Sequence, residues 1–193
     1  MREWIDTGLQ PMRMSVNVSA RQFRAGNLVE TIVASLAAAK LSPDFLDVEL
    51  TEGTLVTDLA ETRGALERLR EIGVTVSLDD FGTGYSSLGY LTSLPIDTLK
   101  IDRSFVVDGL ADADGIAVSS AIIGLAKTLG MEVLAEGVDS EKQLADLTAL
   151  GCDNIQGFLI AKPLPASEVL SWVDHYQLHG HRGPQETPQA AQA

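Results

Sequence analysis

The stretch that decides the fold of this chain is VTVSLDDFGTGYSSL, residues 74–88. Its first five residues are mostly β-branched or apolar, which predicts a buried strand. The strand ends in two adjacent carboxylates, Asp79 and Asp80, and a glycine-punctuated loop follows. Hard cations such as Mg²⁺ and Mn²⁺ take oxygen ligands, so two acids at the end of a buried strand indicate a candidate metal site. Taken alone, the pair also fits a capped strand end followed by a surface turn.

Strand-like and helix-like patterns alternate along the rest of the chain. Short β-branched or apolar runs predict strands at residues 14–18, 46–50, 75–78, 98–101, 133–135 and 154–156. Apolar residues at helical spacing predict helices at residues 28–39, 58–72, 115–129, 140–150 and 166–176. This alternation predicts the α/β class, with a parallel sheet and helices outside it.

A polar or charged residue stands at or just past the C-terminal end of every expected strand. These residues are Asn17, Glu49, Asp79, Lys100, Glu136 and Gln156. In a (β/α) barrel of the TIM type, the C-terminal rim of the strands is where the active site lies. Two amides, three carboxylates and a lysine can surround a cation and an anionic substrate. The sequence therefore predicts a barrel with a metal-dependent site at one rim.

Composition limits the class of protein. The chain has 193 residues, of which 45% are hydrophobic and 21% are charged, which is typical of one globular domain with a sizeable core. The net charge of -13 argues against a surface that binds DNA or RNA, but a small nucleotide held through a metal ion stays possible. The single cysteine, Cys152, excludes an internal disulfide and a multi-cysteine zinc site.

Two expectations concern location and domain limits. The apolar runs are short and broken by charges, so we expect no signal peptide, no membrane segment in this chain and a cytoplasmic location. From about Gly180 the sequence turns to Gly, Pro, Gln and Ala without a periodic pattern. We therefore expect one domain over residues 1–176 and a disordered tail over residues 177–193.

The rim residues lie in motifs that resemble those of the EAL domain family, the bacterial cyclic di-GMP phosphodiesterases. These motifs are NVSARQF at 17–23, ELTE at 49–52, DDFGTG at 79–84, LKID at 99–102, AEGV at 135–138, QGF at 156–158 and KPLP at 162–165. The resemblance covers residues 4 to about 176, and the order and spacing of the motifs make it specific. It implies a (β/α) barrel and hydrolysis of cyclic di-GMP to linear pGpG.

The resemblance also implies a cofactor and its ligands. Asn17, Glu49 and Asp79 are expected to bind Mg²⁺ or Mn²⁺. Asp80 is expected to serve a second ion or its water and to face the substrate.

The remaining implied roles concern water, substrate and loop. Lys100 would contact the attacking water, and Glu136 would bind or deprotonate a water at the metal. Gln156 would fix the site and the substrate through hydrogen bonds. Glu52 would brace the loop at residues 80–88, which in the family couples substrate binding to dimerisation.

The chemistry of the rim residues agrees with these roles. Hydrolysis of a phosphodiester needs a nucleophilic water and neutralisation of charge on phosphorus, and metal ions supply both. No histidine lies among the rim residues, so a histidine base is not expected. Lys100 follows an apolar run, and we expect partial burial to lower its pKa.

The Glu-Ala-Leu signature that names the family, a metal ligand on an early strand, is not found in this sequence. Only about six of the eight strands of a closed barrel are predicted, which leaves the strands at 14–18 and 154–156 as unpaired edges. The chain is then a fragment of a longer gene, a degenerate domain, or half of an assembly with a second copy, and we favour the first.

Two functions therefore stay open, a metal-dependent phosphodiesterase and an inactive module that binds cyclic di-GMP or a protein. The expected partners are cyclic di-GMP and either a second copy in a homodimer or upstream sensor or GGDEF-type domains. A less favoured third possibility is an unrelated magnesium-using barrel with a lysine base.

Overall fold

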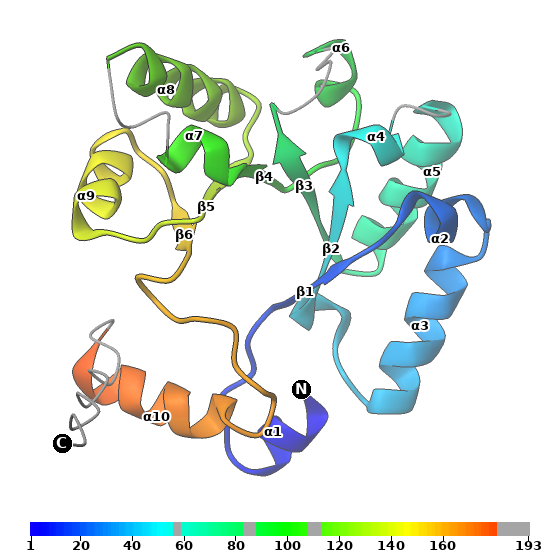
Figure 1. Ribbon diagram of the computed structural model, residues 1–193. Coiled ribbons are helices and arrows are strands. Elements are labelled where there is room, and N and C mark those ends of the chain that lie inside the picture. The colour runs from blue at the N-terminus through cyan, green and yellow to red at the C-terminus, as the bar shows by residue number, and fades with distance from the viewer. Residues whose placement is uncertain (56–58, 83–87, 108–112, 181–193) are drawn as a thin grey trace, which may run out of the picture.

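The computed structural model describes residues 1–55, 59–82, 88–107 and 113–180. Six parallel strands form one sheet in chain order, and the sheet curls into a half-barrel (Figure 1). The strands are β1 (Met14–Asn17), β2 (Leu46–Thr51), β3 (Thr75–Phe81), β4 (Thr98–Ile101), β5 (Glu132–Glu136) and β6 (Asn154–Gln156). All six lie at the predicted positions, and the predicted α/β class and barrel-like architecture are confirmed.

Helices follow the strands and cover the outside of the sheet (Figure 1). The longer ones are α3 (Leu28–Ala39), α5 (Leu59–Glu71), α8 (Ala113–Thr128), α9 (Glu141–Ala149) and α10 (Val169–His179). The short ones are α1 (Arg2–Asp6), α2 (Ala20–Arg24), the 3₁₀ turn η1 (Pro43–Phe45), α4 (Glu52–Leu55), α6 (Leu88–Leu91) and α7 (Arg103–Val107). The five predicted helices correspond to the five longer ones.

The hydrophobic core lies between the outer face of the sheet and the helices. Alternate strand residues supply one side of this core, among them Val48, Leu78 and Leu99, which are all buried. Leu66 on α5 and Ile123 on α8 pack into the same cluster. Burial of these side chains removes apolar surface from water and holds the helices on the sheet.

The inner face of the sheet, in contrast, is polar. Strand register places on it Ser15, Asn17, Asp47, Glu49, Ser77, Asp79, Thr98, Lys100, Glu136, Asn154 and Gln156, with Leu134 as an apolar member. The inside of a TIM-type barrel is more commonly filled by branched apolar side chains. Here polar and charged side chains lie on the inner face, and the apolar core lies on the outer face.

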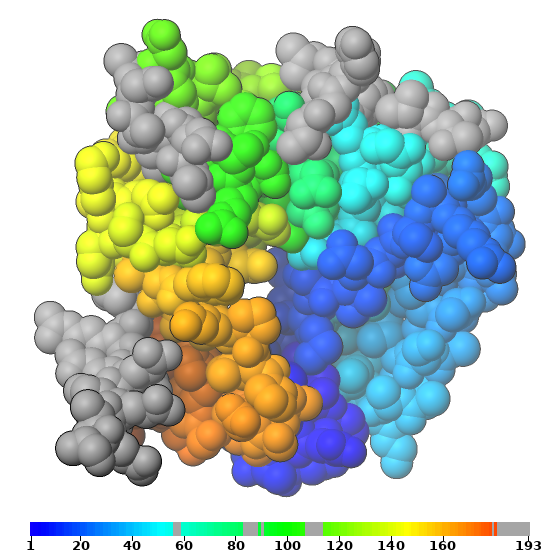
Figure 2. All heavy atoms as spheres, in the orientation of Figure 1, coloured from blue at the N-terminus to red at the C-terminus, as the bar shows by residue number. Residues whose placement is uncertain are grey.

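Both ends of the sheet are open edges within the described residues. β1 pairs only with β2, and β6 pairs only with β5, as predicted. Val16 on β1 is 44% exposed as a result. A hollow opens near the centre of the face shown in Figure 2, between the blue surface around β1 and the yellow-orange surface around β6.

The segment before α10 is tied to the N-terminal helix. Trp4 Nε1 on α1 donates a hydrogen bond to the Ala166 carbonyl oxygen over 3.2 Å, and α1 and α10 lie beneath the open side of the sheet (Figure 1). α10 continues to His179, so the expected domain boundary at residue 176 falls inside a helix. Between the start of α10 and Gly180, the sequence has no proline or glycine that would end the helix earlier. Gly180, which follows the last residue of α10, has a φ of 71°. Of the tail expected at residues 177–193, residues 177–179 belong to α10, and residues 181–193 lie outside the described residues.

Among the described helices, none combines the length and the apolar character needed to cross a membrane.

Candidate active site

Lys100 lies at the centre of the candidate site. Its Nζ is 2.6 Å from Glu136 Oε1, 2.8 Å from Glu49 Oε1 and 3.0 Å from Asp79 Oδ1. The lysine side chain is only 4% exposed. The four side chains come from β2, β3, β4 and β5, because the C-terminal ends of parallel strands meet at one rim and their inner-face residues converge there.

The pKa of Lys100 differs from the sequence-based expectation. Burial alone lowers it, but the hydrogen bonds that Lys100 donates to Glu136, Glu49 and Asp79, together with the charge of Glu136, raise it above the ordinary value. The expectation of a lowered pKa was therefore wrong. An apolar run in the sequence shows burial but not the three carboxylates that other strands bring to the same ammonium group. Lys100 is a protonated donor in this site.

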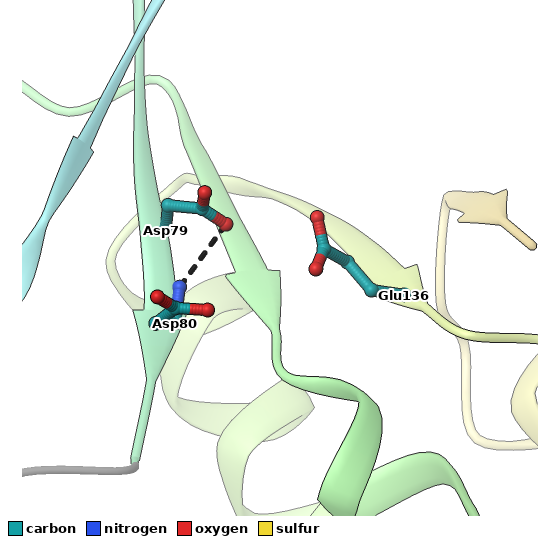
Figure 3. A group of neighbouring side chains, drawn as sticks. All are labelled: Asp79, Asp80 and Glu136. Carbon is teal, nitrogen blue, oxygen red and sulfur yellow. Dashed lines mark hydrogen bonds between the residues drawn. The ribbon is translucent and has the colours of Figure 1, made fainter. Parts of the chain in front are cut away.

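Three acids form the cluster best suited to a cation. Oxygen atoms of Asp79, Asp80 and Glu136 all lie within 4.8 Å of one another. Asp79 and Glu136 point toward each other from β3 and β5, and the backbone N–H of Asp80 donates to Asp79 Oδ1 over 3.1 Å (Figure 3). Carboxylate oxygens at this spacing could hold a metal ion that prefers oxygen ligands.

The backbone helps to form this cluster. Asp80 has a φ of 55°, in the left-handed region that few residues other than Gly, Asn and Asp occupy. The register between β3 and β4 is irregular between Leu78 and Phe81, which is typical of a bulge. The irregularity lets two consecutive residues, Asp79 and Asp80, both contribute to one rim.

Two acids of the cluster, Glu136 and Asp80, have a pKa above the ordinary value of a carboxylate. Burial raises the pKa of Glu136, and Asp79 and Glu49 add to this rise, while Lys100 opposes it. Burial also raises the pKa of Asp80, and the charge of Asp79 acts in the same direction. In both groups burial is the largest cause of the shift, and the charge of neighbouring acids adds to it. A bound cation would relieve this repulsion.

The other predicted site residues lie at the same rim but farther from the cluster. Asn17 is the last residue of β1 and pairs in register with Glu49, and Gln156 is the last residue of β6 and pairs with Glu136. Both amides are exposed on the open edges. The structure thus confirms the placement of all six rim residues, and their individual roles stay predictions.

Glu52 is buried at the start of α4, directly after β2. Residues 83–87 of the loop that it is predicted to brace lie outside the described residues.

Sequence reasoning missed an ion pair that joins three rim loops. Arg103 Nη2 after β4 pairs with Asp139 Oδ2 after β5 at 3.1 Å, and Asp139 Oδ1 accepts the Phe158 N–H after β6, also at 3.1 Å. Asp139 is adjacent to Ser140, which caps α9, so no separate pattern in the sequence indicates this bridge.

Next to this bridge, the segment after β6 crosses the segment after β5 at close range. The Val138 N–H donates to the Gln156 carbonyl oxygen, and the Leu159 N–H donates to the Val138 carbonyl oxygen. A Cβ atom on Gly157 would lie 2.1 Å from the Val138 oxygen and 2.3 Å from its nitrogen. Only glycine fits at this crossing.

The EAL domain family model matches residues 1–163 of this sequence. The chain belongs to the EAL domain family. Members named cyclic di-GMP phosphodiesterase occur among its relatives, and the six rim residues lie in the motifs by which the sequence resembles the family.

Relatives and solved structures agree with this assignment. The chain is 44% identical over 173 residues to the bifunctional diguanylate cyclase/cyclic di-GMP phosphodiesterase MucR of Pseudomonas aeruginosa, covering 90% of this chain and 25% of MucR. A structure of PaMucR phosphodiesterase in complex with c-di-GMP matches with a TM-score of 0.82 and 44% identity, over 88% of this chain and 68% of that one.

The manganese/cy-diGMP complex of Klebsiella pneumoniae BlrP1 matches with a TM-score of 0.76 and 30% identity, over 84% of this chain and 42% of that one. This EAL domain chain spans about a quarter of the length of the curated relatives that it matches first, which are MucR (25%) and the cyclic di-GMP phosphodiesterase NbdA of Pseudomonas aeruginosa (22%).

Proposed function

We propose that this chain hydrolyses cyclic di-GMP to linear pGpG with the help of a divalent cation. The observation that carries this proposal is the buried Lys100 held by Glu49, Asp79 and Glu136 beside the cluster of Asp79, Asp80 and Glu136. A phosphodiesterase needs such a combination, because the substrate is anionic and the attacking water must lose a proton. The likeness to c-di-GMP complexes of EAL proteins supports the choice of substrate.

The acids and one amide of the rim would hold the cation. Asp79, Asp80 and Glu136, with Glu49 and Asn17 from the neighbouring strands, would hold Mg²⁺ or Mn²⁺. The bound cation would neutralise charge on the phosphate and lower the pKa of a water.

Lys100 remains protonated, and its three N–H donors hold Glu49, Asp79 and Glu136. To contact the attacking water, Lys100 would release one of these acids to the cation. Glu136 belongs to the acid cluster and pairs with Lys100, so it would bind the cation or accept a proton from a water at the cation. Gln156 lies beside Glu136 on the open edge, where it can hydrogen-bond the substrate.

Metal binding is the first test. The wild-type chain is expected to give a calorimetric signal with Mn²⁺, and Asp79→Asn is expected to weaken this binding on the order of tenfold or more, since a carboxylate ligand is lost. Asp146→Asn serves as the control, because Asp146 pairs with Lys142 on the surface of α9. Equal Mn²⁺ affinity in the wild type and Asp79→Asn would contradict the ligand assignment.

A second candidate is a module that binds cyclic di-GMP without hydrolysing it. The exposure of Asn17 and Gln156 on open edges favours this alternative, because small errors in position cost large factors in rate. Chromatography of cyclic di-GMP incubated with the chain and Mn²⁺ separates the two functions. Formation of pGpG that is lost in Glu136→Gln supports the phosphodiesterase, and calorimetric binding of cyclic di-GMP without product supports the module.

The proposal extends to location and assembly. We propose a cytoplasmic chain that works as a homodimer or beside sensor or GGDEF-type domains. Support comes from MucR, in which the matched segment makes up a quarter of a bifunctional protein. Light scattering of the purified chain would show whether it forms a dimer by itself.

A further inference from the structure

A second polar layer lies beneath the rim carboxylates, and none of the roles above uses it. Asp47 on β2 is only 4% exposed, and its carboxylate accepts hydrogen bonds from serines on both neighbouring strands. Ser15 Oγ on β1 donates to Asp47 Oδ2 over 2.9 Å, and Ser77 Oγ on β3 lies 2.8 Å from each carboxylate oxygen. One buried side chain thus joins three strands.

The position of this layer relates it directly to the candidate metal site. Each of its three members precedes a predicted metal ligand by two residues on the same strand: Ser15 precedes Asn17, Asp47 precedes Glu49, and Ser77 precedes Asp79. Side chains two residues apart on a strand point to the same face, separated by roughly 6–7 Å along the strand. The hydrogen-bonded triad therefore lies one layer below the predicted ligands.

The triad matters most for β1, which is a four-residue edge strand with one neighbour. In the part of the chain that the structure describes, the bond from Ser15 to Asp47 is the hydrogen bond by which a β1 side chain reaches the rest of the sheet. A strand that slips by one residue turns every side chain to the opposite face. Such a slip would turn Asn17 away from the site, and the Ser15–Asp47 bond opposes it.

On β3 the triad acts just before the backbone becomes irregular. Ser77 pairs in register with Glu49 on one side and Thr98 on the other, and the register with β4 shifts after Leu78. Asp79 thus depends on Ser77 as the last regularly paired inner-face residue before it. A fixed Ser77 keeps Asp79 at its distance from Lys100.

We propose that Asp47 is a positioning residue for the metal site. Asp47 holds β1, β2 and β3 in the register that brings Asn17, Glu49 and Asp79 together. This inference rests on the proposed function, because it takes those residues as ligands. Asp47 itself does not reach the metal. Its effect is transmitted through the hydroxyl groups of Ser15 and Ser77 and the strands that carry them.

The test measures Mn²⁺ affinity by calorimetry in variants of the full chain. Asp47→Val removes both hydrogen bonds and is expected to lower Mn²⁺ affinity about 10- to 100-fold, the usual effect of losing a group that orients a ligand. Asp47→Asn can accept from one serine and donate to the other, so its affinity is expected to stay within about threefold of the wild type.

A matched control separates positioning from general loss of stability. Val48 is the next residue of β2, is buried, and points into the outer core rather than into the barrel. Val48→Ala leaves a cavity and lowers the free energy of unfolding. Its Mn²⁺ affinity is expected to equal that of the wild type, although its melting temperature falls.

Several results would overturn the inference. The first is a Mn²⁺ affinity of Asp47→Val equal to that of the wild type. The second is a loss of Mn²⁺ affinity in Asp47→Asn as large as in Asp47→Val, which would assign the effect to charge. The third is an equally large loss in Val48→Ala. If Asp47→Val does not fold, Ser77→Ala takes its place, because it removes a single hydroxyl group. Ser77→Ala is also expected to weaken Mn²⁺ binding. An unchanged Mn²⁺ affinity in this variant would count against the inference. A wild-type chain that binds no Mn²⁺ would instead refute the proposed function.

Discussion

Replacing Lys100 with methionine is expected to lower the free energy of unfolding by about 3–5 kcal/mol in the absence of divalent cations. Methionine has a similar length but no charge, so Glu49, Asp79 and Glu136 would face one another without their shared cation. Removing one partner of a buried ion pair is costly because the remaining charges stay poorly hydrated. Urea unfolding in the presence of a chelator measures this loss.

The same variant is expected to lose hydrolysis of cyclic di-GMP by a factor on the order of 100 or more, as when a positioned donor is removed from an active site. Mn²⁺ is expected to restore part of its stability, because a cation that binds only the folded state stabilises it by mass action. Stability and turnover are therefore expected to respond differently to the metal.

Lys127→Met provides the control for this prediction. Lys127 pairs with Asp153, but both side chains are more than a third exposed, and exposed pairs contribute about 0–1 kcal/mol. A Lys100→Met variant that unfolds at the same urea concentration as Lys127→Met would show that the three acids do not need their buried counter-charge.

Gly157→Ala is expected to lower the free energy of unfolding by about 3 kcal/mol or more, or to prevent folding. The added methyl group would overlap the backbone of Val138, and backbone atoms cannot rotate away as a flexible side chain can. Relief requires the segments after β5 and β6 to separate, which would break the hydrogen bonds of Val138. Gln156, adjacent to the clash, would leave its place beside Glu136.

The matched control is Gly64→Ala in α5, where an added methyl group meets no atom within 4 Å. Glycine is less favourable than alanine inside a helix, so this change is expected to stabilise the fold by up to about 1 kcal/mol. Thermal unfolding of the two variants gives shifts of opposite sign. A melting temperature for Gly157→Ala at or above that of the wild type would show that the methyl group fits between the segments after β5 and β6.

The sequence predicted most of the fold because local patterns determine it. The apolar run before Asp79 and the helical spacing around Leu66 and Ile123 are visible in short windows, and parallel sheets follow from their alternation. The rim site could be predicted for the same reason, since parallel strands bring their C-terminal ends to one edge. The position of Glu49 and Glu136 at this rim could be predicted without knowledge of long-range packing.

What could not be predicted depends on contacts between distant residues. The raised pKa of Lys100 requires three acids from three other strands, and the hydrogen bonds of Asp47 require the exact register of β1 and β3. Alternation does offer a signal for Asp47, because it stands two residues before Glu49. Nothing local distinguishes the bridge from Arg103 through Asp139 to Phe158.

The left-handed backbone at Asp80 has an evolutionary consequence. Asp, Asn and Gly adopt this conformation readily, whereas most other residues lose about 1–2 kcal/mol in it. Glutamate can supply the same charge but not the same turn, so the acid at this position is restricted to aspartate. On the proposed function, a lineage that abandons catalysis while keeping its fold is steered toward Asn or Gly here. In any descendant, this residue records whether selection has preserved the charge or only the shape of the chain.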